Sequence, residues 1–299
     1  MNLANINILQ QIVNAIWLGS VYSLFALGYA LVFSVLGVLN LAHSAVFMWG
    51  AFIGLAAVLQ FNMPVWLSIP IAMIGSAVIS VALERIAFAP LRRRNAPRIS
   101  QLISSIGAAI LLVSLAQLIF GTQPQRFPLG SIPTDTVPGL PFRITPIQIV
   151  VVVISLLLMA LLWFLVQRTR LGQAMRAVAF NQKTASLLGI HVGRIFLLTF
   201  AFAGALAGAS GVLYGLAYNA MTPFIGEQVA LKGLTVIVLG GMGSIQGAVI
   251  GGFVVAALEV FSIALGGSTY RDAIVFALLF LILLVRPQGL VGQKLSTRA

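Results

Sequence analysis

The sequence predicts an all-α polytopic membrane protein with about eight or nine transmembrane elements, some of them broken or half-length. The chain has 299 residues, of which 60% are hydrophobic and 7% are charged, and its mean hydropathy is +1.09. Soluble proteins carry about a quarter charged residues, so the composition is far from theirs. Long apolar runs of bilayer-spanning length alternate with short polar segments. We expect a single transmembrane domain over residues 1–299.

Composition also excludes several functions. The chain has no cysteine, so it has no disulfide framework, thiol nucleophile or cysteine-based metal site. Its net charge of +12 would suggest a nucleic-acid partner in a soluble protein. In a membrane protein the same excess is expected on the cytoplasmic side, and we expect no nucleic acid.

The first apolar segment covers residues 8–37, which is longer than the roughly 20 residues that cross a bilayer. Asn14, Gly19 and Ser20 interrupt it, and they predict a short amphipathic entry followed by a span. No charged side chain precedes Glu84, so the positive start of a cleaved secretory signal is absent. We expect this segment to be retained as a span.

The polar residues Asn40, His43 and Ser44 follow, between two apolar segments. A helix that breaks here would aim polar groups at a cavity inside the membrane. An ordinary turn with a hydrogen-bonded histidine is the alternative, and the sequence leaves both open.

Four further spans are expected before the central polar segment. They cover residues 44–59, 65–88, 102–120 and 146–166, with a turn at 62–64 between the first two. The span 102–120 follows Arg92, Arg93 and Arg94. Burying this arginine triplet in the bilayer would cost about 8–10 kcal/mol, so the triplet lies outside the hydrocarbon. Five prolines between residues 121 and 145 predict an extended, ordered external loop.

The longest polar segment, residues 167–194, carries five basic residues and no carboxylate. Its apolar residues recur at helical spacing, so it predicts two short amphipathic helices, and Gly189 is a natural helix stop. Such a loop presents a shaped surface to a cytoplasmic partner. The basic residues are Arg168, Arg170, Arg176, Lys183 and Arg194, and the apolar ones are Leu171, Met175, Val178, Ala185 and Leu188.

The last third contains a sixth span over residues 195–217 and a final span over 273–285, and places Glu227 in an external turn. Between them, residues 229–239 are too short to span comfortably and end in GGMGSIQGAVIGG, which continues as an apolar run to residue 265. Half-helices that meet at glycines are typical of transporter pathways. A tight turn with small-residue packing is the alternative, and it explains the later glycines better than Gly240, Gly241, Gly243 and Ser244.

Charge asymmetry predicts the orientation. If the arginine triplet, the central polar segment and the C-terminal tail share one side, that side holds 13 of the 17 basic residues and one of the five acids. The other side holds four basic and four acidic residues, so the whole net charge follows the positive-inside rule. We expect an external N-terminus and a cytoplasmic C-terminus.

The chain has no motifs of an ATP-binding loop, because Lys183-Thr184 follows Gln182 rather than a glycine-rich loop. Its two histidines form no metal-hydrolase pattern, so we expect no enzyme. Voltage-sensing arginines and a potassium-type filter are also absent, which disfavours a channel without excluding it.

Six motifs in order resemble the permease subunits of bacterial ABC importers for branched-chain amino acids, of the LivH type. They are NLAHSAVFMWGAF (40–52), ERIAFAPLR (84–92), LISSIG (102–107), RAVAFNQKTASLLGI (176–190), VLGGMGSIQGAVIGG (238–252) and YRDAIVFALLFLILLVRPQGLVG (270–292). The family usually shows an acidic residue at the position of Phe180, so charge pairing with an ATPase at that point is not expected here.

The resemblance implies a multi-pass protein of the bacterial inner membrane in a heteromeric importer. Its partners would be a paralogous LivM-like permease, two cytoplasmic ABC ATPases, a periplasmic or extracellular substrate-binding protein and the lipid bilayer. ATP and Mg²⁺ would bind the ATPases, and this chain would hold no cofactor. Urea or short amides are alternative substrates, and a passive channel for small neutral solutes is the rival function.

Three groups of candidate residues follow. Those expected to couple to the ATPase are Arg176, Lys183, Ala185, Leu187, Leu188 and Gly189. Those expected to line the translocation pathway are Asn40, His43, Ser44, Gly240, Gly241, Gly243 and Ser244, at two breaks of comparable depth that could face one another or the second permease. Glu84, Arg85 and Glu259 are expected to be structural ionisable residues, with Glu259 paired to Lys232 or Arg271 rather than serving as a proton relay.

Overall fold

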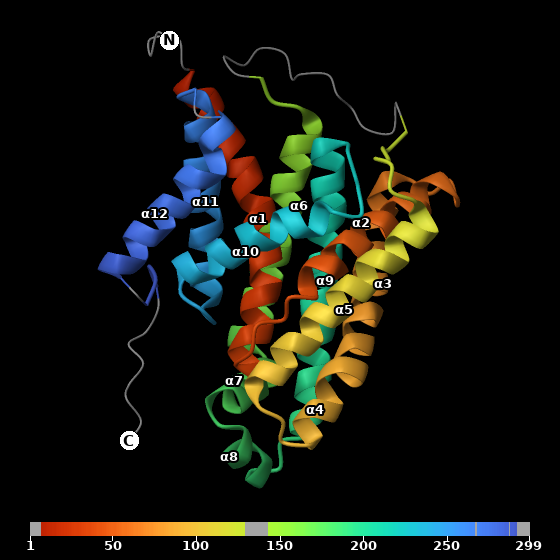
Figure 1. The fold of residues 1–299 in the computed structure, drawn as a ribbon, viewed down its shortest axis with the longest axis vertical. Helices are drawn as coiled ribbons and strands as arrows, with labels where there is room; N and C mark the ends of the chain where they lie inside the picture. The colour runs from red at the N-terminus through yellow and green to blue at the C-terminus, as the bar shows by residue number, and fades with distance from the viewer. Residues whose placement is uncertain (1–6, 129–142, 267, 287, 292–299) are drawn as a thin grey trace.

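Helix α1 (Ile8–Leu36) runs through the middle of the bundle, and other helices pack around it (Figure 1). The structure is a computed structural model and describes residues 7–128, 143–266, 268–286 and 288–291. A π-helical turn at Glu84–Phe88 joins α3 to α4, and a 3₁₀ turn at Ser268–Tyr270 precedes α12. The other helices are α2 (His43–Leu59), α3 (Val65–Leu83), α4 (Ala89–Arg93), α5 (Arg98–Phe120), α6 (Pro146–Arg168), α7 (Arg170–Phe180), α8 (Gln182–Leu187), α9 (Val192–Tyr218), α10 (Ile225–Gly240), α11 (Ile245–Ala264) and α12 (Arg271–Val285).

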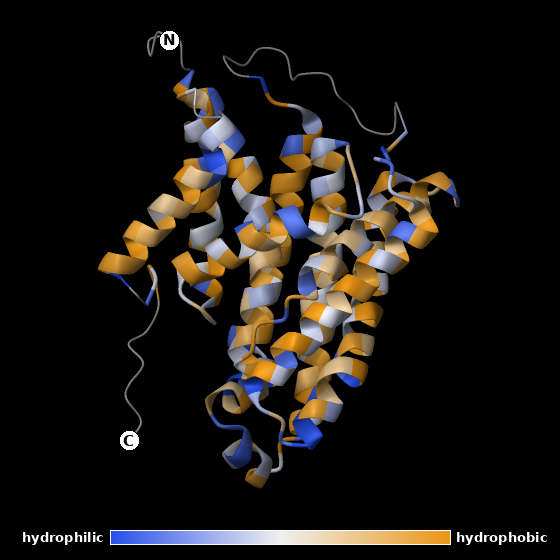
Figure 2. Ribbon diagram, viewed as in Figure 1, coloured by the Kyte–Doolittle hydropathy of each residue, from blue (hydrophilic) through white to orange (hydrophobic). Residues whose placement is uncertain are grey.

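The predicted all-α polytopic fold is confirmed. In the described residues, 6 helices are long and apolar enough to cross a membrane: α1, α5, α6, α9, α11 and the continuous unit Val65–Arg93. Among the shorter helices of the described residues, α2 is also apolar, and α10 and α12 pack into the same bundle. Orange, apolar residues cover the outward faces of the bundle in Figure 2, as a lipid environment requires.

The expectation of an amphipathic entry before the first span is wrong, because α1 is one continuous helix of 29 residues. Its polar residues are accommodated within the helix. Asn14 accepts a hydrogen bond from Gln10 (3.2 Å), and the Ser20 hydroxyl donates to the Trp17 carbonyl (2.7 Å). Gly19 lets Phe253 of α11 approach α1, since a Cβ at that position would lie 2.6 Å from the Phe253 ring.

The third span runs past its predicted end at residue 88 and reaches Arg93. Pro90 lies in the first turn of α4, a position at which a proline is tolerated. The π-turn before it shifts the hydrogen-bond register, so the helix continues through a residue that would normally end it.

Small residues bring α9 against α2 and α3. A Cβ at Gly208 would lie 2.4 Å from the Ala72 carbonyl oxygen, and one at Gly211 would lie 2.2 Å from that of Phe47. These glycines therefore allow the close approach of α9 to its two neighbours.

The two ends of the bundle differ in charge. The lower end in Figure 2 is blue, and it holds α4, α7, α8 and the start of α5. At the opposite end, the Gln10 side chain pairs with the backbone of Arg143 (2.7 and 3.0 Å), and Gln125 forms an antiparallel bridge with Met221. Of the predicted loop 121–145, residues 129–142 lie outside the described residues.

Two short helices begin inside the bundle rather than at its ends. α2 starts near mid-height, and α10 crosses the long helices obliquely (Figure 1). α10 begins at Ile225, four residues before the predicted start, because Gly226 lets it pack against the Ser44 carbonyl. Glu227 consequently lies in the first turn of α10, and its expected place in an external turn is wrong.

Candidate functional site

The central polar segment forms the two short helices that the sequence predicts, α7 and α8, at the basic end of the bundle. Thr169 begins α7: its hydroxyl oxygen accepts from the Gly172 amide (3.1 Å). Gly172 is needed there, because a Cβ would lie 2.2 Å from the Val166 carbonyl oxygen and 2.4 Å from that of Leu165. α7 is thereby held against the end of α6.

A side-chain contact strengthens this attachment. Arg176 of α7 donates to the Val166 carbonyl at the end of α6. Met175 and Val178 are buried on the inner face of α7, while the charged part of the segment remains in solvent. The predicted amphipathic character is therefore present. The contacts of Arg176 and Gly172 with the end of α6 fix the position of α7.

α8 is a rigid turn that presents two leucines outward. Asn181 caps its start by accepting from the Thr184 amide (3.0 Å), and Ala185 is buried beneath it. At its end, the Ile190 amide bonds the Ala185 carbonyl and the Gly189 amide bonds that of Ser186, which is the Schellman arrangement. Gly189 has φ +83°, a left-handed conformation that glycine adopts without strain.

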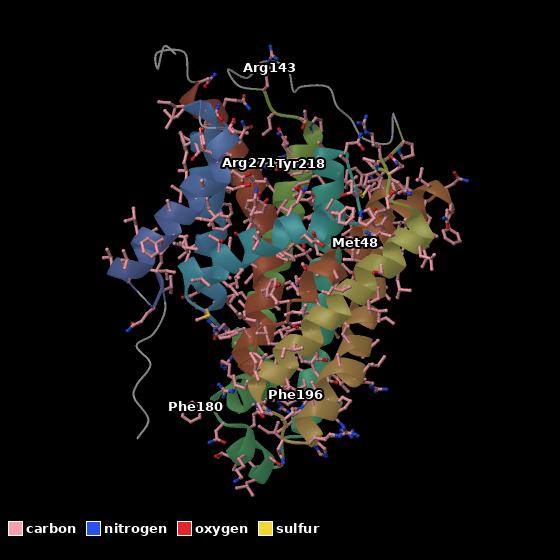
Figure 3. All side chains as sticks on the ribbon, in the orientation of Figure 1. Met48, Arg143, Phe180, Phe196, Tyr218 and Arg271 are labelled. Carbon is pink, nitrogen blue, oxygen red and sulfur yellow. The ribbon has the colours of Figure 1, made fainter. Side chains whose placement is uncertain are left out.

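Leu187 is 87% exposed and Leu188 is 75% exposed, and Lys183 is exposed beside them. Figure 3 shows Phe180, 70% exposed, standing away from the ribbon on the same segment. Two neighbouring leucines in solvent on a capped helix end form a small apolar knob. We call Leu187 and Leu188 the leucine knob.

The first predicted break lies between α1 and α2 and is packed in the protein interior. Asn40, His43 and Ser44 are all buried. The backbone donors freed by the break find partners: the Leu41 amide donates to Ser105 Oγ (3.2 Å) and the Ala42 amide to Asn40 Oδ1 (3.2 Å). Irregular backbone inside a membrane is tolerated when its polar groups are satisfied in this way.

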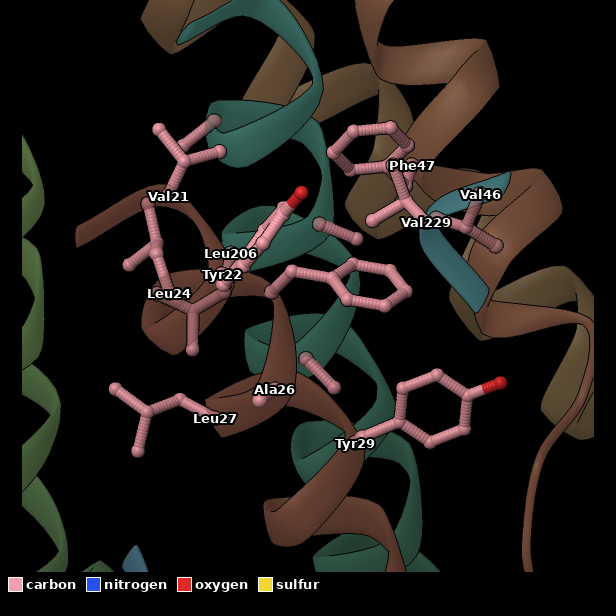
Figure 4. Packing of buried hydrophobic residues seen from close by; sticks show 14 of the residues in the cluster. Val21, Tyr22, Leu24, Ala26, Leu27, Tyr29, Val46, Phe47, Leu206 and Val229 are labelled. Atoms are coloured by element: carbon pink, nitrogen blue, oxygen red, sulfur yellow. The ribbon is translucent and has the colours of Figure 1, made fainter. Parts of the chain in front are cut away.

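Three buried polar atoms near this break have no hydrogen-bond partner within the described chain. They are Asn40 Nδ2, His43 Nδ1 and the Tyr29 hydroxyl. The Tyr29 and His43 rings lie 4.8 Å apart, centre to centre, and His43 Nε2 lies 3.4 Å from the Phe25 carbonyl. Figure 4 shows Tyr29 extending from α1 toward α2, on the side where Phe47 and Val229 lie. These neutral groups can form hydrogen bonds with a polar solute and so replace the water that the solute loses.

The second predicted break, between α10 and α11, is closely packed. Gly240 and Gly247 touch through their backbones, since a Cβ at Gly240 would lie 2.0 Å from the Gly247 carbonyl oxygen. Gly241 and Gly243 take positive φ, and Ser244 caps α11 by accepting from the Gly247 amide (3.0 Å). The chain beyond α12 covers this corner, because the Leu290 amide donates to the Leu239 carbonyl (2.8 Å).

The two breaks do not meet within the chain. Ser44 lies against Gly226 at one end of α10, and the second break follows Gly240 at the other end. Fourteen residues of helix separate them, which is about 21 Å at 1.5 Å per residue.

Glu259 is the centre of a charged cluster that joins four helices. Its carboxylate is 2.5 Å from Lys232 Nζ on α10 and 3.6 Å from Arg271 on α12, and it accepts from the Tyr22 hydroxyl on α1 (3.0 Å). Lys232 also donates to the Tyr22 oxygen (2.9 Å). The expected pairing of Glu259 with Lys232 or Arg271 is confirmed. Arg271 marks this region in Figure 3.

Glu84, which is 2% exposed, pairs with Arg92 (2.5 Å) across the π-turn, whereas its neighbour Arg85 is exposed. The Arg92 guanidinium also lies 3.9 Å from the centre of the Phe196 ring of α9. This cation–π contact ties the end of the third span to the start of α9.

Residues 11–283 match the family model described as "Branched-chain amino acid transport system / permease component". The chain belongs to this family. It is 37% identical over 296 residues to the high-affinity branched-chain amino acid transport system permease protein LivH of Escherichia coli, covering 95% of this chain and 96% of the relative. The permease BraD of Pseudomonas aeruginosa is 37% identical over 297 residues, with the same two coverages.

Among solved structures, PsaBC from Streptococcus pneumoniae in complex with Fab matches with a TM-score of 0.51. The match covers 96% of this permease and 94% of that chain at 11% identity, so it supports the fold alone. As a family member with several membrane-spanning helices, this permease is a multi-pass inner-membrane protein.

Sequence reasoning missed several residues of this permease that hold the candidate sites in place. Thr169 and Asn181 stand before short helices, where cap residues are expected, so that signal was present. Gly172, Arg92 and Tyr29 act through contacts with residues of other helices or turns, which no spacing in the sequence reveals.

Proposed function

We propose that the chain is the membrane-spanning permease subunit of an ATP-driven ABC importer for branched-chain or other neutral amino acids. The observation that carries the proposal is the leucine knob on a rigid, capped segment, in a chain whose sequence has no ATP-binding loop. A transporter without its own energy source needs a surface that receives force from an ATPase. The family membership and the relatives named LivH and BraD support the same function.

The proposed partners follow from this role. Two cytoplasmic ABC ATPases would bind ATP and Mg²⁺ and receive Arg176, Lys183, Ala185, Leu187, Leu188 and Gly189, with the leucine knob contributing most. A paralogous LivM-like permease would complete the pathway, and an external binding protein would deliver substrate. This chain would hold no cofactor and catalyse no reaction of its own.

The proposed orientation has an external N-terminus and a cytoplasmic C-terminus. It is supported by the arginine-rich end that carries α4, α7 and α8, whereas the start of α1 lies at the opposite end beside Arg143. Basic residues accumulate on the cytoplasmic side of membrane proteins. The leucine knob would then lie in the cytoplasm, where an ATPase can reach it.

We further propose that the pathway runs along the Asn40–Ser44 break, with the Gly240–Ser244 corner on the same route at the interface with the second permease. The polar groups at the first break are neutral, and three of them are unpartnered in the described chain. Neutral hydrogen-bonding groups can replace the water shed by a zwitterion without the cost of burying a fixed charge. Weak binding here also suits an importer whose external protein captures the substrate.

The substrate is tested by reconstituting the full complex with its binding protein and offering radiolabelled leucine, urea or acetamide with ATP. ATP-dependent uptake of leucine alone supports the proposal. Uptake of urea or acetamide alone would identify the alternative substrates, and equal leucine flux with or without ATP would identify a passive channel.

A further inference from the structure

A groove of about 1110 Å³ opens at the basic end of the bundle, between the end of the third span and the loop that links α8 to α9. It is larger than the roughly 300–1,000 Å³ of pockets that enclose a small ligand. Its size and its opening to the surface suit a ligand that enters only in part. Phe196, labelled in Figure 3, is one of the residues that line it.

The groove is lined by the end of the third span and by the start of α9. Higher in the bundle, glycine and serine bring their backbones together: a Cβ at Gly204 would lie 2.6 Å from the Ser76 carbonyl oxygen. Toward the basic end, larger side chains make the contact between the third span and α9. Phe88 packs on Phe200, and Arg92 packs on Phe196. The groove lies next to these contacts, with residues from 84–93 on one side and residues from 192–197 on the other.

The lining combines arginines with apolar side chains. Four arginines and the single carboxylate of Glu84 line the groove, which gives it a formal charge of +3, and Glu84 is already paired with Arg92. Arg85, Arg93 and Arg194 are exposed at its outer part. One buried guanidinium nitrogen of Arg92, NH1, has no hydrogen-bond partner in the described chain. The apolar lining includes Pro90, Val192, Phe196 and Leu197.

The length of the helix that leads to the groove matches the thickness of the hydrocarbon layer. Arg85 follows Val65, the first residue of the span, by 20 residues of nearly continuous helix, which corresponds to about 30 Å. That is the thickness of the hydrocarbon layer. Next to the groove, Ile86 is 78% exposed and Leu198 is 37% exposed, so apolar surface continues from the groove toward the bilayer.

We propose that this groove binds an anionic phospholipid of the inner leaflet, with the lipid phosphate held by Arg85, Arg93 and Arg194 and the acyl chains lying over Ile86 and Leu198. Basic pockets at the cytoplasmic ends of membrane helices are suited to anionic headgroups. Guanidinium groups bind phosphate through two parallel hydrogen bonds. The bound lipid would contact α8 through Gln182 and Ser186 and so brace the segment that carries the leucine knob.

An acidic segment of an ATPase is the competing occupant, and the geometry disfavours it. The groove is lined by Gln182, Ser186 and Gly189 of the α8 region but by neither Leu187 nor Leu188. Of the residues proposed for ATPase contact, only Gly189 also lines the groove, so the two surfaces meet at Gly189 and are otherwise made of different residues. The lipid inference goes beyond the proposed function and does not depend on which solute is carried.

The test is native mass spectrometry of the full-length chain purified with its partner subunits. The probes are dioleoylphosphatidylglycerol, which is anionic, and dioleoylphosphatidylcholine, which has the same acyl chains and no net charge. We expect the wild type to retain phosphatidylglycerol at least tenfold more tightly. The variant Arg85→Gln/Arg93→Gln/Arg194→Gln should lose at least tenfold in this affinity, since each basic residue near an anionic membrane contributes about fivefold.

The matched control is Arg94→Gln/Arg168→Gln/Arg170→Gln, which removes the same charge from exposed positions outside the groove lining. It should retain the lipid preference, and equal loss in both variants would overturn the proposal. So would equal binding of the two lipids, displacement by inorganic phosphate, or lipid binding that appears only when the ATPases are removed. If the triple variant fails to fold, Arg93→Gln alone should lose about fivefold.

Discussion

Replacing Leu188 with aspartate tests the coupling surface most directly within this chain. Leu188 is 75% exposed and ends α8 with φ −82° and ψ 11°, a backbone that aspartate adopts readily. The change should therefore leave folding and membrane insertion unaffected, because it removes little buried area. Any loss of activity would arise at the contact with a partner.

The magnitude follows from burying a leucine. A leucine side chain that is fully buried in a partner's groove contributes about 1.5–3 kcal/mol, and an aspartate there would add the penalty of an unpaired charge. We expect ATPase binding to weaken at least about 30-fold and transport-linked ATP hydrolysis to be abolished. Leu188→Ala should show the apolar part of this loss alone.

The matched control is Lys183→Gln, on the same helix and equally open to solvent. An exposed ion pair contributes about 0–1 kcal/mol, so this variant should lose at most about fivefold. The measurements are co-purification of the ATPase subunits and substrate-stimulated ATP hydrolysis at equal amounts of membrane-inserted chain. Normal coupling in Leu188→Asp, or a larger loss in Lys183→Gln, would refute the reasoning.

Three further predictions concern residues inside the bundle. Glu259→Gln leaves Lys232 without its carboxylate, so thermal unfolding should show a loss of up to about 3–5 kcal/mol while the pH profile of uptake stays unchanged; an altered profile at unchanged stability would indicate a proton relay instead. Cysteines placed at Ser44 and Ser244, in a chain with no native cysteine, should react with small polar thiol reagents to an extent that changes with ATP, and lack of reaction in every nucleotide state would remove these breaks from the pathway. Gly172→Ala should displace α7 and uncouple ATP hydrolysis at a cost of about 1–3 kcal/mol, and Gly193→Ala, where a Cβ meets nothing within 4 Å, is its control; equal activity in both would show that α7 is not rigidly held.

Local sequence patterns predicted the local structure well. The apolar runs predicted the six long helices that can cross a membrane, and the spacing of Met175 and Val178 predicted the inner face of α7. Gly189 marked the end of α8 because its left-handed conformation is a property of one residue and its neighbours. Each of these features is set within a few residues along the chain.

Contacts between distant segments were not predictable in the same way. The span 65–88 was predicted to end at residue 88, but through a π-turn the helix continues to Arg93. The oblique course of α10 was not predictable either, because it depends on contacts such as that of Gly226 with the Ser44 carbonyl. The pairing of Glu259 was foreseen because a buried carboxylate in a membrane needs a cation, whereas the part played by Tyr22 depends on how α1 and α11 pack.

The central claim is that this permease moves its solute uphill with energy from a separate ATPase. The direct measurement is the concentration of leucine inside proteoliposomes that contain the two permeases and the ATPases, with the binding protein outside and ATP inside. The account predicts that the internal concentration exceeds the external one, and that the difference disappears when ATP is omitted or when Leu188→Asp replaces the wild type. Equilibration to the external concentration at the same rate in all three conditions would contradict it.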